Sequence, residues 1–254
     1  MEAQGLLRVA GVRPNDVAHL EAVFAASAEG PLKAAGFLHE LVLMNYGGTL
    51  LSERFVKRAY ALCAEHDVPA LADEIQTGIW SPELFLFREY GVQPDFVALG
   101  KGFPGGEYPA SRLLFTERMD GLPQFGALVT NGQEELASLA YLVTMRWARE
   151  NADLTAAVGA YYEARVRELA ERHRDRIARV EGLRHMLGVY FEDTAVATAY
   201  AKRLNADGLD ISVQTYKTDT PPSALVKLPL TVDHGVVDFV VERMARALDA
   251  RATA

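Results

Sequence analysis

The sequence lacks the features of a disulfide-bonded, membrane-spanning or nucleic-acid-binding protein. Its one cysteine, Cys63, has no partner for a disulfide within the chain. No apolar run reaches the roughly 18–20 residues that a membrane span needs. The 34 Asp and Glu residues outnumber the 26 Lys and Arg residues, and a net charge of −8 is unfavourable for binding to a phosphate backbone. Since no basic and apolar leader precedes the first turn, we expect a protein of the reducing cytoplasm.

The patterns of a metal site and of a P-loop are also missing. Cys63 and His66 could form half of a metal site, but no second pair follows at ligand spacing. Gly102 follows Lys101 where a P-loop would have Ser or Thr. We therefore expect no metal ion and no phosphate-binding P-loop.

Enough apolar side chain is present for a folded core. The chain has 254 residues, of which 50% are hydrophobic and 24% charged, and this composition excludes disorder over most of its length. Helical patterns and strand-length apolar runs alternate in the first half. The helices are expected from Val17 to about Glu29 and from a cap at Ser52 to about Asp67, and the strands over 36–43, 68–74 and 95–101. This order is typical of an α/β fold with a parallel sheet.

The second half has a different pattern. Long helices are expected over 137–147 and 154–180, strands over 187–191, 209–215 and 224–230, and a last helix after a cap at Asp233. We therefore predict a partial large domain over residues 1–144 and a small α+β domain over 145–254.

Two polar residues follow neighbouring strands of the predicted sheet. Asp73 lies at the end of one strand and Lys101 at the end of the next. The carboxyl ends of parallel strands meet at one edge, where ligands bind, so we expect the two side chains to converge. A lysine set among glycines and shielded from bulk water is a candidate for Schiff-base chemistry. The alternatives are a surface lysine that closes a strand, and acids at Asp73 and Glu74 that cap the next helix.

Four ordered segments extend this pattern. They are residues 72–78 (ADEIQTG), 90–95 (YGVQPD), 99–102 (LGKG) and 105–109 (GGEYP). Together they resemble the core of the class III aminotransferases, the pyridoxal 5'-phosphate-dependent ornithine and 4-aminobutyrate aminotransferase group of fold type I. The resemblance covers nearly the whole chain from about residue 13. It implies an α/β fold, with part of the mostly parallel large-domain sheet followed by the smaller α+β domain.

The resemblance implies a role for five residues. Lys101 would form the Schiff base with pyridoxal phosphate and move the substrate proton. Asp73 would meet the pyridine nitrogen, Ile75 would pack on a ring face, and Gln76 would bind the ring hydroxyl. Thr130 would reach the cofactor phosphate of a neighbouring subunit, which implies a homodimer with shared active sites. From the sequence alone, Thr130 could equally be a loop hydroxyl.

The chain departs from the family pattern at two places near the expected site. Residues 79–82 (IWSP) replace a Gly-x-Arg-Thr-Gly stretch, so substrate access can differ. Lys227 replaces the arginine that binds the substrate carboxylate; it keeps the charge but loses the two-pronged contact. The alternative for Lys227 is an edge-strand lysine that faces water.

The largest departure is in length. By the resemblance, the chain begins inside the large domain, and the loop that holds the cofactor phosphate has no counterpart in it. We therefore expect a truncated chain or one half of a split enzyme, with an amino-terminal half supplied in trans. A hydrophobic surface near 36–43 or 1–12 should mark where missing strands would pack.

The function implied by the resemblance is transamination of an amino acid or ω-amino compound to a keto acid or aldehyde acceptor. Two alternatives remain open. One is a racemase or decarboxylase of the same fold, and the other is a catalytically inactive remnant that acts as an interaction or structural domain.

Overall fold

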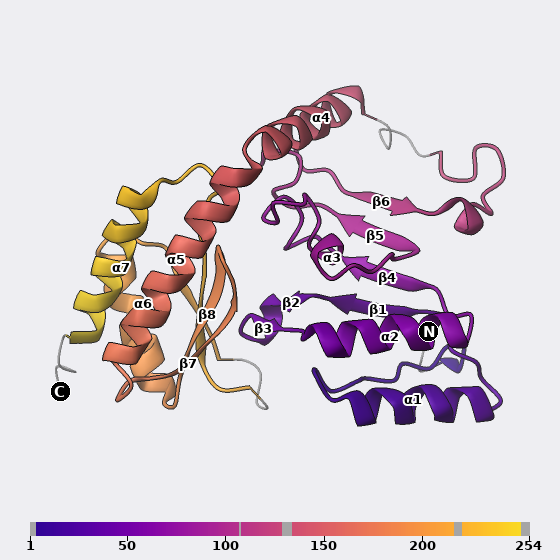
Figure 1. Cartoon of the computed structure of the whole chain (residues 1–254), viewed down its shortest axis with the longest axis horizontal. Coiled ribbons are helices and arrows are strands. Elements are labelled where there is room, and N and C mark those ends of the chain that lie inside the picture. Colours follow the sequence, from indigo (N-terminus) through magenta and orange to yellow (C-terminus); the bar gives the residue numbers. More distant parts are fainter. Residues whose placement is uncertain (1–3, 107, 129–133, 216–219, 250–254) are drawn as a thin grey trace.

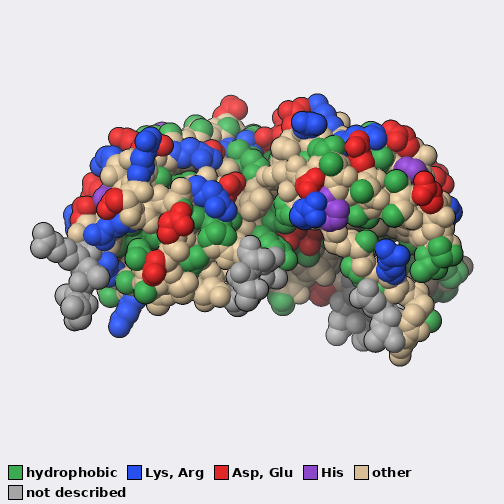
Figure 2. Space-filling model, turned by 90° about the horizontal axis from the view of Figure 1, so that it is seen from below, with side chains coloured by type: hydrophobic (Ala, Val, Ile, Leu, Met, Phe, Trp, Pro, Cys, Tyr) green, Lys and Arg blue, Asp and Glu red, His purple; other side chains and the backbone are tan. Residues whose placement is uncertain are grey.

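The computed structural model describes residues 4–106, 108–128, 134–215 and 220–249. Two parts lie side by side, linked by the consecutive helices α4 (Glu135–Glu150) and α5 (Ala152–Arg172) (Figure 1). The predicted boundary between residues 144 and 145 falls inside α4, and it stays a prediction. Within the described ranges, no helix is long and apolar enough to cross a membrane. On the face shown in Figure 2, acidic and basic side chains are interspersed rather than gathered by sign.

The first part is built around a four-stranded sheet. Its elements before α4 are α1 (Val17–Glu29), β1 (Phe37–Glu40), β2 (Val42–Leu43), η2 (Met44–Tyr46), β3 (Thr49–Leu50), α2 (Glu53–Glu65), β4 (Ala70–Asp73), α3 (Leu86–Glu89), β5 (Phe96–Leu99), β6 (Arg112–Phe115) and η3 (Glu117–Met119). The strand order is β1-β4-β5-β6, in which the first three strands are parallel and β6 is antiparallel. The mostly parallel sheet predicted for this half is therefore confirmed.

Side-chain caps fix where the first two helices begin. The Asp16 carboxylate accepts a hydrogen bond from the backbone N–H of His19 at 2.9 Å, and the Ser52 hydroxyl accepts one from Phe55 at 3.3 Å. Each bond satisfies a backbone donor that the first turn of a helix leaves free. Both helix starts agree with the sequence prediction.

The two faces of the first sheet are covered differently. Ala72 and Val97 are buried in the core that the strands share with α2. The opposite face carries one cross-strand row, which consists of Leu38, Leu71, Phe96 and Phe115. At the ends of this row, Leu38 is 70% exposed and Phe115 43% exposed. Parallel strands normally have both faces covered, so within the described residues this face is open. The hydrophobic surface expected near 36–43 or 1–12 is present at Leu38 and, in the first segment, at Leu6 and Val9, which are 69% and 67% exposed, whereas Leu41 and Val42 are buried.

The second part is an α+β unit with its own core. After α5 its elements are β7 (Ile177–Leu183), β8 (Met186–Phe191), α6 (Thr194–Ala206), β9 (Ser212–Gln214), β10 (Ser223–Lys227) and α7 (His234–Asp249). The sheet is antiparallel, in the order β7-β8-β10-β9. Side chains of α5, α6 and α7 pack into one apolar cluster with those of the strands. The predicted α+β character of the second half is confirmed.

Several predicted elements have different bounds. The expected helix over 154–180 ends at Arg172, and residues 177–180 belong to β7, where pairing with β8 overrides the helical pattern. The apolar run over 36–43 is broken at Leu41 into β1 and β2. The strand β6 and the helix α6 were not expected. The Asp193 carboxylate accepts hydrogen bonds from two backbone N–H groups of α6, so its capping pattern was the signal for this helix.

Candidate active site

Asp73 and Lys101 lie at the same edge of the first sheet. Asp73 is the last residue of β4, and Lys101 lies two residues beyond the end of β5. The two strands are parallel neighbours, and their register pairs Asp73 with Ala98. The convergence expected from the sequence is therefore present in the fold, while the chemical roles of the two residues stay predictions.

The Asp73 carboxylate is partly engaged. Its Oδ1 accepts a hydrogen bond from the backbone N–H of Ile75 at 2.9 Å, which fixes the turn after β4. Within the described residues, its Oδ2 has no hydrogen-bond partner. Asp73 therefore presents a held carboxylate with one oxygen available to a ligand donor.

Lys101 occupies an unusual backbone conformation. Its φ of 51° is in the left-handed region, which costs a non-glycine residue about 1–2 kcal/mol. Such residues are concentrated at functional sites. The expectation that this lysine is shielded from bulk water is wrong, because Lys101 is exposed and its loop continues into exposed Gly105 and Gly106.

Glu40 brings a second carboxyl group to this edge. It ends β1, and its register partner on β4 is Asp73. Burial and then repulsion by Asp73 raise the pKa of Glu40, and the positive charge of Lys101 opposes that rise. Glu40 thus lies within electrostatic reach of both residues. No role was predicted for Glu40 from the sequence, although its place at the end of a parallel strand was a signal.

Lys227 reaches the site from the second part of the molecule. Its Nζ donates a hydrogen bond to the backbone oxygen of Gln76 at 2.7 Å and lies 3.5 Å from the centre of a Trp80 ring. Burial and then repulsion by Lys101 lower its pKa to about 8. The pairing of β10 with β9 ends at Leu225, but Lys227 is half-buried against Gln76 and Trp80, so the alternative of a lysine that faces water is wrong.

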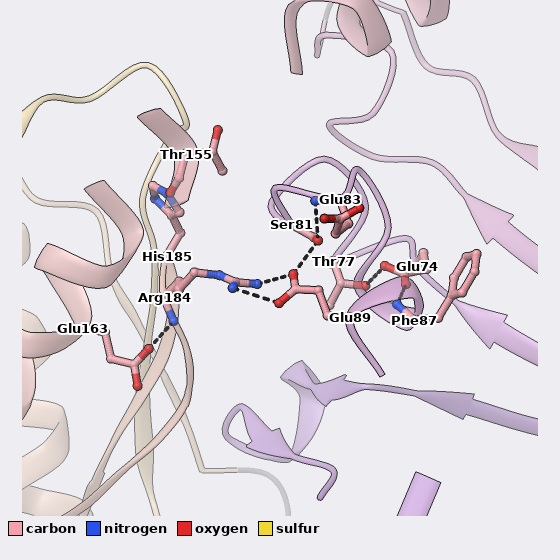
Figure 3. A network of polar contacts seen from close by, with 10 residues as sticks. All are labelled: Glu74, Thr77, Ser81, Glu83, Phe87, Glu89, Thr155, Glu163, Arg184 and His185. Atoms are coloured by element: carbon pink, nitrogen blue, oxygen red, sulfur yellow. Dashed lines mark hydrogen bonds and ion pairs between the residues drawn. The ribbon is translucent and has the colours of Figure 1, made fainter. Parts of the chain in front are cut away.

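Glu74 organises the loop that follows β4. It is buried, and its carboxylate accepts hydrogen bonds from the Thr77 hydroxyl and, at 2.8 Å, from the backbone N–H of Phe87 (Figure 3). Burial raises its pKa, and these hydrogen bonds oppose the rise. No helix directly follows Glu74, but Phe87 lies in the first turn of α3. The expected capping role is therefore exerted across the loop.

An ion pair fastens the same loop to the second part. The Arg184 guanidinium donates to both carboxylate oxygens of Glu89, at 2.6 and 3.0 Å (Figure 3). The Ser81 hydroxyl donates to Glu89 at 2.5 Å, and the backbone N–H of Arg184 donates to Glu163 at 2.7 Å. The loop over 74–89 is thus held at one end of the β7–β8 hairpin. Sequence reasoning did not find this contact, which joins residues far apart in the chain.

The remaining predicted site residues are Gln76, Ile75 and Thr130. Gln76 contacts Lys227 through its backbone oxygen and, at 3.5 Å, through its side-chain oxygen. Ile75 packs near Gly100, which precedes Lys101. Thr130 lies outside the described residues. The structure therefore gathers Asp73, Gln76 and Lys227 around the loop that also leads to Trp80.

Comparisons with known proteins agree with this architecture. The family model for class III aminotransferases matches residues 13–248. The chain is 29% identical to the ornithine aminotransferase of Bordetella pertussis over 222 residues, which are 85% of this chain and 52% of that protein. It is 31% identical to the 5-aminovalerate aminotransferase of Pseudomonas aeruginosa over 184 residues, 70% of this chain and 42% of that protein. The chain spans about half the length of the curated relatives it matches.

Solved structures show the same fold. The ornithine aminotransferase of Plasmodium yoelii superposes with a TM-score of 0.79 at 20% identity, covering 93% of this chain and 61% of that one. The N-acetylornithine aminotransferase of Stenotrophomonas maltophilia gives a TM-score of 0.76 at 23% identity, with the same coverage of both chains. The fold is that of the fold type I transferases. The chain belongs to the class III aminotransferase family, whose members depend on pyridoxal phosphate.

The described residues fit the ring end of that cofactor. Lys101 offers an exposed amine on a strained turn, and Asp73 offers a carboxylate oxygen without a partner among the described residues. A carboxylate and an amine at one sheet edge are the groups that a protonated pyridine ring and an aldehyde require.

Proposed function

We propose that this protein takes part in pyridoxal-phosphate-dependent transamination, moving an amino group from an amino acid or ω-amino compound to a keto acid or aldehyde. The observation that carries the proposal is the placement of Lys101 and Asp73 at the ends of adjacent parallel strands, in a chain that belongs to the class III family. The named relatives act on ornithine and 5-aminovalerate, which supports a substrate with an amino group far from its carboxylate.

Lys101 and Asp73 have complementary tasks in this proposal. When bound, pyridoxal phosphate supplies a conjugated ring that withdraws electrons from the reacting carbon. Lys101 would hold the cofactor through Nζ, and the same amine would move a proton at the reacting carbon. The Oδ2 of Asp73, which has no partner among the described residues, would hold a proton on the ring nitrogen, and the Ile75 hydrogen bond fixes the orientation of the carboxylate.

The other predicted residues position the reactants. Gln76 binds the ring hydroxyl and Ile75 packs on a ring face. Lys227 binds an anionic group of the substrate, which the contact between its Nζ and Gln76 supports. Thr130 contributes to the phosphate site of a neighbouring subunit.

The assembly extends beyond this chain in our proposal. The open face of the first sheet, with Leu38 70% exposed, supports a missing amino-terminal portion of the fold that packs there, in trans if the enzyme is split. We further propose a homodimer with shared active sites. A cytoplasmic location is supported by the single free cysteine, Cys63.

Covalent mapping tests the proposal. The purified chain is incubated with pyridoxal phosphate, alone and with an amino-terminal fragment of a family member, then reduced with borohydride and digested for mass spectrometry. We expect the label on Lys101, and stronger labelling and transaminase turnover only when the fragment is present. The chain alone should bind the cofactor weakly because its sheet is open on one face.

Matched variants make the result specific. Lys101→Ala should abolish the label, and Lys202→Ala, which changes an exposed lysine of the second part, should not. Label on Lys227 with none on Lys101 would contradict the assignment. Cofactor binding without turnover in any assembly would favour the inactive remnant, and a racemised or decarboxylated product would favour the related reactions.

A further inference from the structure

Trp80 contacts the end of β10 in two ways. A ring of its indole lies 3.5 Å below the Nζ of Lys227, and its Nε1–H donates a hydrogen bond to the backbone oxygen of Leu228 at 3.1 Å. A cation over an indole face is attracted by the ring's electrons. One side chain of the first part therefore holds both the ammonium group and the backbone that carries it.

The far edge of the same indole reaches the loop of Lys101. A Cβ atom built on Gly102 would lie 2.9 Å from Cη2 of Trp80, closer than side-chain carbons pack. The absence of a side chain at Gly102 thus admits the indole beside Lys101. Trp80 therefore contacts Lys227 on one side and Gly102, the residue after Lys101, on the other.

The ammonium group of Lys227 is surrounded, in the described part of the chain, by neutral groups rather than by a carboxylate. Within the described residues, its contacts are the two oxygens of Gln76 and the Trp80 ring, and none is a carboxylate. A carboxylate partner would neutralise the ammonium and occupy the place of an incoming anion. An aromatic ring and neutral oxygens position the ammonium and leave its charge available.

We propose that Trp80 is a positioning and specificity-determining residue of the Lys101 site. It holds Lys227 beside the site as an ammonium that no carboxylate of the described residues neutralises, and so selects substrates with a carboxylate at the end that faces Lys227. This inference rests on the proposed function, because it assumes that the substrate lies between the two lysines. Trp80 belongs to the stretch over 79–82 that departs from the family pattern.

The test measures Lys227 itself and needs no turnover. The chain is trace-labelled with acetic anhydride, and the acetylation of Lys227 is quantified by peptide mass spectrometry against exposed Lys202. Succinate is the carboxylate probe, and sodium chloride at equal ionic strength is the control. In the wild-type chain we expect succinate to protect Lys227 saturably and to leave Lys202 unchanged.

Three variants separate positioning from general damage. Trp80→Leu should raise the half-protecting succinate concentration by about 2- to 30-fold, the range that corresponds to a cation–π contribution of about 0.5–2 kcal/mol. Trp80→Phe keeps an aromatic face and should stay nearer to wild type. Tyr190→Phe removes a different hydrogen bond between the two parts, from the Tyr190 hydroxyl to the backbone oxygen of Tyr46, at the end of β10 opposite Lys227, and should leave the protection unchanged.

Two outcomes would overturn the inference. In one, Trp80→Leu protects like wild type or Tyr190→Phe loses protection equally, and then the indole only joins the two parts. In the other, succinate protects nothing in the wild-type chain, and Lys227 is no anion receptor. The borohydride label at Lys101 does not depend on the protection of Lys227 by succinate. Loss of that label therefore shows failure of the proposed function separately from failure of this inference.

Discussion

All six residues of β8 are buried, whereas none of the four residues of β6 is. The helices of the second part cover one face of their sheet, and the first part approaches the other. The Tyr190 hydroxyl donates to the backbone oxygen of Tyr46 at 2.7 Å, and a Cβ atom on Gly188 would collide with the backbone of Gly47. Among the residues that the structure describes, nothing covers Leu38 and Phe115 of the first sheet in a comparable way. The first part thus covers one face of the second sheet, whereas the described residues of the second part do not cover the open face of the first sheet.

This difference matters for the candidate site. Glu40 and Asp73 are register partners, two residues along their strands from Leu38 and Leu71, so they lie on the open face. The carboxylates of Glu40 and Asp73 therefore belong to the first sheet, which has an open face. Lys227 comes from the second part, in which β8 is fully buried. Any segment that covers the open face also changes the water content around Asp73.

The largest expected effect tests the comparison directly. Phe191→Ala removes a fully buried ring from the second core and should lower the free energy of unfolding by about 3–5 kcal/mol. Phe115→Ala, at an exposed end of the open row, should cost less than about 1 kcal/mol. Urea unfolding followed by circular dichroism measures both. Equal losses would show that the first sheet is covered after all, for instance by a second copy.

The next effect concerns Asp73. In the assembly that turns over, Asp73→Asn should leave the cofactor bound but raise the reaction barrier by about 2–4 kcal/mol, a loss of roughly 30- to 1000-fold in kcat. A neutral amide no longer holds the proton on the ring nitrogen. Glu83→Gln, an exposed acid on the following loop, is the matched control and should be unchanged. Unaltered turnover in Asp73→Asn would remove its assigned role.

The convergence of Asp73 and Lys101 at one edge of the sheet could be predicted from the sequence because it depends on local patterns. An apolar run that ends in a polar residue reports both a strand and its end. Parallel pairing of neighbouring strands then brings the ends together, whatever lies in the rest of the chain. For the same reason, the helix starts at Asp16 and Ser52 were predictable from their caps.

Contacts between the two parts could not be predicted in this way. Lys227 meets Gln76 across 151 positions of sequence, and Arg184 meets Glu89 across 95. No periodicity within either segment specifies the other. The strand β7 was missed for a related reason, since its pairing with β8 outweighs the helical pattern of residues 177–180.

A smaller effect is expected where the two parts are fastened. Arg184 and Glu89 have side chains only 16% and 26% exposed, and they make a two-pronged contact. A double-mutant cycle with Arg184→Met and Glu89→Gln should give a coupling energy of about 1–3 kcal/mol in urea unfolding. The exposed pair Lys57–Glu53 is the control, and should couple by less than about 0.5 kcal/mol. Equal coupling in the two cycles would mean that the Arg184 contact is no stronger than a surface pair.

The last expected effect is a change in pH dependence at Lys227. Its pKa is about 8 in the folded chain against 10.5 ordinarily, so between these values the unfolded chain holds a proton that the folded chain has released. Stability from this group must therefore rise with pH across that window, and below it both states are protonated and the penalty of burying the charge is constant.

Lys227→Met removes the titrating group, so its free energy of unfolding should be higher than that of wild type near neutral pH, and the advantage should shrink from pH 8 towards 10. Lys202→Met, at an exposed position, should follow the wild-type curve. Urea titrations at a series of pH values measure the difference, and a Lys227→Met curve parallel to wild type would show that this ammonium is not held in the interface between the two parts.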